Sequence, residues 1–135
     1  MDDKDIQVLN KIYEHICSVL KYCEGCKNLE DFQEDSMRVE ACVFNLMQIG
    51  ELAKQSLSDE AKQQIKNIPW RQIYGMRNRI VHGYSGVNMK IVWDTIHDDL
   101  PDLKKELKPH IKSEKPEAET SNSAERIKSD NKSDD

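Results

Sequence analysis

Apolar residues recur every three to four positions over most of this 135-residue chain, and this period constrains its fold more than any other feature. Spacings of three and four place side chains on one face of an α-helix, whereas a half-buried β-strand would show strict alternation. The sequence contains neither strand-like alternation nor an internal repeat. The pattern therefore predicts an all-α fold, an antiparallel bundle of four to five helices.

Boundary residues locate these helices. Asp35 or Ser36 can cap the second helix. Pro69 suits the first turn of the third helix, and Gly83 is a typical C-terminal stop. Pro101 falls inside the fourth helix and should bend it or split it in two. We expect long helices at residues 6–23, 37–57, 69–83 and 88–111, with a short amphipathic segment at 58–68.

The C-terminal segment has a different composition. Residues 112–135 contain only Ala118, Ala124 and Ile127 as apolar side chains among Lys, Glu, Ser and Asp. This is too little apolar surface to offset the entropy of ordering the segment. We therefore expect a helical domain at residues 1–111 followed by a disordered polar tail.

No apolar stretch approaches the ~20 residues that a membrane crossing needs, and the N-terminus lacks the regions of a signal peptide. We expect a cytoplasmic protein without a membrane partner. Its four cysteines should then be free thiols. The sequence CEGC at 23–26 lacks both the βαβ context of a redox pair and the further ligands of a zinc site, so we predict no metal and no cofactor.

Charge is distributed unevenly along the chain. The formal net charge is −5, yet residues 61–93 contain no Asp or Glu and six Lys or Arg. Such a segment can contact nucleic-acid phosphates, or it can be a solvated helix face beside an acidic neighbour, and charge alone leaves both alternatives open. If RNA binds here, the expected phosphate contacts outside the motif core are Arg71, Arg79 and Lys90.

The eight residues RNRIVHGY, 77–84, combine groups that suit metal-independent RNA cleavage. On a helix Asn78 and His82 share a face, and Arg77 lies beside that face. Histidine can exchange a proton with a ribose hydroxyl, and arginine can stabilise a phosphorane-like transition state, while Asn78 can orient the histidine or the phosphate. One histidine cannot comfortably act as both acid and base, so a dimer that pairs two copies of the motif is expected.

The wider sequence resembles a known family. Residues 68–103 resemble the signature region of the HepT-like ribonuclease toxins of the HEPN superfamily, and residues 45–54, NLMQIGELAK, resemble the preceding helix of that family. The family motif is matched by Arg77, Asn78, His82 and Tyr84. The resemblance implies a homodimeric HEPN-like bundle with its RNase site in a cleft between protomers. It also implies a type VII toxin–antitoxin pair, in which an MNT-type nucleotidyltransferase antitoxin transfers AMP to the motif tyrosine.

An alternative remains open at this point. The chain could be a non-catalytic HEPN module that binds a nucleotide or a partner protein, although such a module has no need of His82. Tyr84 could likewise be an aromatic residue that closes the core rather than a modified one. Glu51 follows Gly50 on the second helix. If buried, Glu51 would need a cation such as Arg77 or Arg79, and if exposed it would need none, so we leave it outside the catalytic set.

Overall fold

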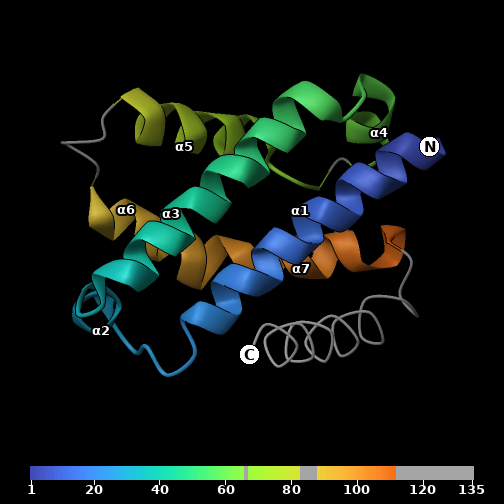
Figure 1. The fold of residues 1–135 in the computed structure, drawn as a ribbon. Coiled ribbons are helices and arrows are strands. Elements are labelled where there is room, and N and C mark those ends of the chain that lie inside the picture. The colour runs from blue at the N-terminus through green and yellow to red at the C-terminus, as the bar shows by residue number, and fades with distance from the viewer. Residues whose placement is uncertain (66, 83–87, 112–135) are drawn as a thin grey trace, which may run out of the picture.

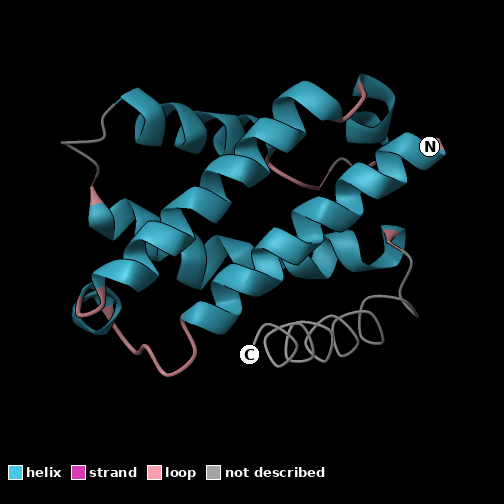
Figure 2. Ribbon diagram, in the orientation of Figure 1, coloured by secondary structure: helices cyan, strands magenta, loops and turns pink. Residues whose placement is uncertain are grey.

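A computed structural model describes residues 1–65, 67–82 and 88–111 (Figure 1). All regular structure in these residues is helical (Figure 2), which confirms the predicted all-α class. The α-helices in chain order are α1 Asp3–Tyr22, α2 Leu29–Gln33, α3 Ser36–Glu51, α4 Asp59–Gln64, α5 Trp70–His82, α6 Met89–Asp94 and α7 Leu100–Leu107. The expected tail, residues 112–135, lies outside the described residues, so its disorder stays a prediction.

Local sequence explains where most helices begin. The side chain of Asp35 starts α3 by accepting hydrogen bonds from the backbone N–H groups of Met37 at 3.0 Å and Arg38 at 3.3 Å. Asn88 starts α6 in the same way, accepting from the N–H of Lys90 at 2.9 Å. Both starts agree with the expected boundaries.

Two π-helical turns modify the expected long helices. Leu52–Ser56 extends α3, and Thr95–Asp99 joins α6 to α7, where the N–H of Leu100 donates to the Thr95 carbonyl five residues earlier. Pro101 follows directly, in the first turn of α7, where its missing N–H disrupts no bond. The prediction was a bend or a split at Pro101. The structure instead shows a change from a π-turn to an α-helix just before this residue. A 3-10 turn at Lys108–His110 follows α7.

The sequence period did not predict α2, which lies in the interruption between the first two expected helices. Asn28 caps α2 by accepting from the Asp31 N–H at 2.9 Å. Phe32 is fully buried, with its ring centroid 5.6 Å from that of Trp93. Because α2 has only five residues, it is too short to show a helical period, and burial of one aromatic ring holds it in place.

The helices pack in a bundle with α3 at its centre. Helix α3 packs against α1 on one side and α5 on the other, while α7 packs against α1 (Figure 1). The largest fully buried side chains come from α1, α2, α3, the second π-turn, α6 and α7: Phe32, Leu9, Ile12, Ile16, Leu46, Ile49, Ile96, Leu107, Val19, Val92 and Cys42.

A buried carboxylate ties α1 to the start of α4. The side chain of Asp5 accepts hydrogen bonds from the Ser58 N–H at 3.0 Å and the Ser58 hydroxyl at 2.7 Å. Ser58 in turn caps α4 by accepting from the Ala61 N–H at 3.1 Å. These bonds favour the ionised carboxylate and lower the pKa of Asp5 below its ordinary value.

The cysteines are free thiols, as predicted. Their arrangement differs from the one that CEGC suggests, because the sulfur of Cys23 contacts that of Cys42 on α3, at 3.6 Å. Both residues are buried. Cys26 is half-buried and follows a turn in which Gly25 has φ +86°, a conformation that favours glycine.

Candidate functional site

The candidate site begins with a close approach of α3 to α5. A Cβ atom added to Gly50 would lie only 2.6 Å from the Cβ of Arg77 and 3.3 Å from the Ile73 carbonyl oxygen. Only glycine lets the helices approach this closely. Gly50 therefore sets the register that brings the end of α3 to Arg77.

Arg77 is held by two side chains at this contact. Its Nε donates to Glu51 Oε2 at 2.5 Å, and its Nη1 donates to Asn78 Oδ1 at 3.0 Å. The Arg77 side chain is 23% exposed and that of Glu51 is 43% exposed, so the pair lies at the surface with the guanidinium reachable from solvent. The result is a permanent cation with a fixed orientation, which suits binding of a phosphate oxygen.

The remaining motif residues are only partly described. The backbone of α5 is helical through His82, which is consistent with Asn78 and His82 sharing a face. The side chains of Arg79 and His82, and the whole of Tyr84, lie outside the described part of the structure. Their predicted roles in phosphate binding, proton transfer and modification therefore stay predictions.

The other predicted RNA contacts, Arg71 and Lys90, are both exposed. Arg71 lies in the first turn of α5, on the same helix as Arg77. Lys90 donates to Asp94 Oδ2 at 2.9 Å, and this bond raises the pKa of Lys90. A phosphate at Lys90 would compete with Asp94, so Arg71 is the better placed of the two.

Two histidines outside the motif, His15 and His97, lie within hydrogen-bonding distance of neighbouring side chains. His15 Nδ1 lies 2.7 Å from the Asn45 side-chain oxygen between α1 and α3, and His97 Nδ1 lies 2.9 Å from Asp98 Oδ1 at the surface. Among the residues described, no three His, Cys, Asp or Glu side chains form a group that could hold a metal ion. Nor is any described helix long and apolar enough to cross a membrane.

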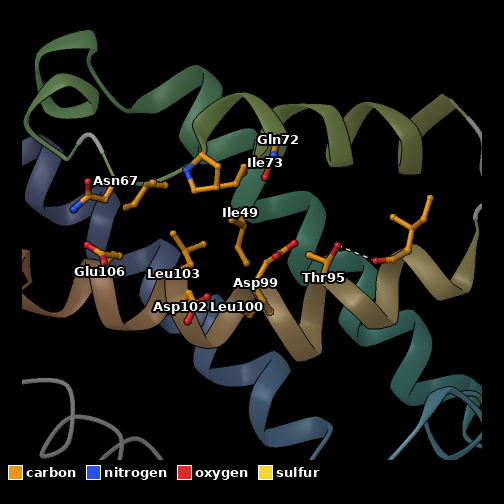
Figure 3. Close-up of a pocket in the computed structure, with 13 residues that line it drawn as sticks. Ile49, Asn67, Gln72, Ile73, Thr95, Asp99, Leu100, Asp102, Leu103 and Glu106 are labelled. Carbon is orange, nitrogen blue, oxygen red and sulfur yellow. Dashed lines mark hydrogen bonds between the residues drawn. The ribbon is translucent and has the colours of Figure 1, made fainter.

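A groove of about 460 Å³ lies between the first half of α5 and the continuous helical segment made of α6, the π-turn Thr95–Asp99 and α7 (Figure 3). Its floor is apolar, and carboxylates line the α7 side. Burial and the neighbouring carboxylates raise the pKa of one of them, Asp99. Neither Arg77 nor Glu51 lines the groove. Because its acidic rim would repel phosphate, this groove is not a candidate RNA site.

Glu51 contacts Arg77, although it lies outside the catalytic set expected from the sequence. The sequence contained a signal for it, because Glu51 follows Gly50, a small residue that permits close helix approach, but burial and exposure of the carboxylate predicted different roles. The structure shows a half-exposed carboxylate paired with Arg77. Asn78 also contacts Arg77, a contact that the sequence did not predict. Its role in orienting His82 or the phosphate stays a prediction.

The chain is similar to several known proteins. A family model described as "Ribonuclease HepT-like" matches residues 12–109. A Caldanaerobacter subterraneus subsp. tengcongensis protein, named provisionally as an RNase, is 39% identical over 105 residues, covering 76% of this chain and 93% of the relative. A Thermococcus cleftensis protein, named provisionally as ribonuclease HepT, is 36% identical over 75 residues, covering 56% and 67% respectively. A Methanocaldococcus jannaschii protein, named provisionally as an RNase, is 27% identical over 109 residues, covering 79% and 97%.

No solved structure matches the chain significantly. The family match spans most of the helical domain, and it includes α3 and α5, the two helices whose contact holds Arg77. The chain therefore belongs to the ribonuclease HepT-like family.

Proposed function

We propose that this protein is a metal-independent endoribonuclease and the toxin of a type VII toxin–antitoxin pair. The observation that carries the proposal is the held guanidinium of Arg77, five residues before His82 on the same helix. Five residues correspond to a rise of about 7.5 Å and a net rotation of about 140° around the helix axis. We rely on the length of the Arg77 side chain to bring its guanidinium to the same RNA phosphate as His82. Membership of the ribonuclease HepT-like family supports RNA as the substrate.

The reaction is an internal displacement at phosphorus. A neutral His82 takes the proton from the ribose 2′-hydroxyl, whose oxygen forms a bond to phosphorus while the bond from phosphorus to the 5′-oxygen breaks. A protonated histidine gives a proton to that leaving oxygen. Arg77 stabilises the extra negative charge on the phosphorane-like transition state, and Arg71 and Arg79 neutralise neighbouring phosphates.

Two histidines in different protonation states are needed, and we assign the second to another copy of the chain. An apolar face on α3 supports a homodimer, because Met37 is 77% exposed and Phe44 is 59% exposed. A groove of about 600 Å³ on this face includes Val43, Met47 and, from α6, Met89. Such a face is unusual on a monomer and is typical of an interface. Covering it with a second protomer would place the protein–protein contact on α3 and the start of α6.

The dimer is tested by measuring molar mass with light scattering at micromolar concentration. We expect twice the chain mass for the wild type and the chain mass for Phe44→Glu. The exposed residue Gln7 on α1 supplies the control, because Gln7→Glu adds the same charge away from the face and should leave the dimer intact. A monomeric wild type would contradict the assignment of two histidines to one site.

Cleavage is tested with purified protein and an RNA oligonucleotide, with and without EDTA. Cleavage should persist in EDTA and be lost in Arg77→Ala and His82→Ala, with helical circular dichroism unchanged. His97→Ala is the matched control, because it removes an exposed histidine on another helix and should cleave at the wild-type rate. Dependence on an added divalent metal, or full activity in both motif variants, would reject the mechanism and favour the non-catalytic binding module.

We further propose that an MNT-type nucleotidyltransferase neutralises the toxin by adding AMP to Tyr84. The tyrosine oxygen bonds to the α-phosphorus of a nucleoside triphosphate as pyrophosphate leaves. The adduct would add bulk and negative charge to the motif, and we expect it to compete with RNA phosphate for Arg77. Co-expression with the nucleotidyltransferase should add one or more AMP masses to the wild type and to Tyr22→Phe, which lacks a different exposed tyrosine. Modification of Tyr84→Phe to the same extent would refute this site.

A further inference from the structure

We infer that Glu51 is a positioning residue for Arg77, an inference that rests on the proposed ribonuclease function. Glu51 would act through the arginine: its carboxylate fixes the guanidinium in the orientation that the transition state needs. Asn78 assists from the next position along α5. Neither residue is required to touch RNA for this role.

The donor geometry of Arg77 supports these separate roles, in which Glu51 orients the guanidinium and the guanidinium contacts the phosphate. An arginine has five N–H donors in a rigid plane. The bond to Glu51 uses the Nε proton, and the bond to Asn78 uses one Nη1 proton. Neither bond uses Nη2, whose two protons can donate to phosphate oxygens. Holding the guanidinium plane at Nε and Nη1 therefore fixes the direction in which Nη2 donates.

The packing of α3 against α5 also restrains the position of Glu51. Glu51 is the last residue of α3, directly after the glycine that lies against Arg77. The carboxylate is thus carried by a helix in contact with α5, rather than by a loop. A partner residue on a helix restrains a catalytic group more tightly than a partner residue on a flexible loop.

The charge of Glu51 separates positioning from substrate binding. A carboxylate beside a phosphate site repels RNA, so it should weaken binding rather than strengthen it. If Glu51 serves orientation, its removal should lower kcat while the KM for RNA stays constant or falls. A residue that bound RNA directly would show the opposite effect on KM.

A second chemical role is conceivable for a half-exposed carboxylate, that of general base for the 2′-hydroxyl. The geometry favours positioning, because Glu51 Oε2 is already engaged by Arg77 Nε. Glutamine distinguishes the two roles. Its amide oxygen still accepts from Nε, although more weakly than a carboxylate, but it cannot take a proton at neutral pH.

The test compares wild type, Glu51→Gln, Glu51→Ala and the control Glu60→Gln, which removes an exposed carboxylate on α4. We expect Glu51→Ala to lower kcat by roughly tenfold to hundredfold, as for about 1 Å of misplacement of a catalytic group. Glu51→Gln should recover part of that loss, with the pH profile keeping its shape. Glu60→Gln should equal the wild type.

A second readout does not depend on cleavage. In ¹⁵N–¹H spectra, the Nε–H signal of Arg77, assigned with Arg77→Lys, should be protected from exchange in the wild type and in Glu60→Gln. It should be lost in Glu51→Ala. Failure of wild-type protein to cleave RNA would reject the proposed function, whereas this signal still decides whether Glu51 holds Arg77.

Three results would overturn the inference. The first is an Arg77 Nε–H signal that Glu51→Ala leaves unchanged. The second is full kcat in Glu51→Ala. The third is a Glu51→Gln variant as inactive as Glu51→Ala that has lost the acidic limb of the pH profile, which would make Glu51 the general base.

Discussion

Replacing Gly50 by alanine should disturb the site without touching any of its polar groups. The added Cβ would lie 2.6 Å from the Cβ of Arg77, whereas ordinary contact begins at 3.4 Å. Helices α3 and α5 must therefore separate by about 0.8 Å at this point, by the difference of these distances. Overpacking of this kind costs about 1–3 kcal/mol, and the better helix propensity of alanine offsets up to ~1 kcal/mol.

Gly75 offers a matched control on α5. A Cβ at Gly75 meets no described atom within 4 Å, so Gly75→Ala should gain helix propensity without a clash. We expect the unfolding free energies of the two variants in urea to differ by about 1–3 kcal/mol, with Gly75→Ala the more stable. That difference measures the helix contact alone.

Activity should follow the displacement of Arg77. A shift of nearly 1 Å in a catalytic group can lower the rate by roughly a hundredfold. Cleavage is therefore measured at a temperature where both variants are folded by circular dichroism, with Gly75→Ala expected to match the wild type. If Gly50→Ala were as stable as Gly75→Ala and cleaved RNA at the wild-type rate, the helix contact would not determine the position of Arg77.

Three further predictions concern the scaffold. Asp5→Ala should lose about 2 kcal/mol of stability at pH 7, since it removes two hydrogen bonds to Ser58. Because the pKa of Asp5 is lowered in the folded state, this difference should be complete above pH 3.8 and shrink as acid protonates the carboxylate, which urea unfolding at several pH values would show. Under peroxide, Cys23 should form a disulfide with Cys42 rather than with the nearer thiol in sequence, and peptide mapping that found the CEGC disulfide would contradict the observed sulfur contact. Truncation after Ile111 should leave the thermal midpoint and RNA cleavage nearly unchanged, and a large loss of stability would mean that the tail docks on the domain.

Much of the fold follows from local sequence. Apolar spacing predicted the long helices, and capping chemistry predicted the start of α3 at Asp35. Asn88 caps α6 at the boundary that was expected for the last helix. These features can be predicted from local sequence, because a helix pairs its backbone N–H and C=O groups internally and needs only one apolar face to pack. The five-residue α2 was missed because a single buried ring, Phe32, stabilises it through a residue far along the chain.

The candidate site likewise contains residues that the sequence predicted and one that only the tertiary structure placed. The sequence by itself placed Arg77, Asn78 and His82 on one helix, because residues one or two turns apart have a spacing that the helix fixes. Only the tertiary structure placed Glu51 on Arg77, since the two residues come from different helices and their contact depends on how closely α3 and α5 approach.

The cysteines give a second example of this division. The sequence predicted free thiols without indicating which cysteines meet, and only the structure shows that the end of α1 brings Cys23 to Cys42 on α3. Sequence determines what a chain can form within one helix, where hydrogen bonds fix the geometry. Contacts between helices depend on packing that local spacing does not encode, and here a glycine without a Cβ decides which carboxylate meets the arginine.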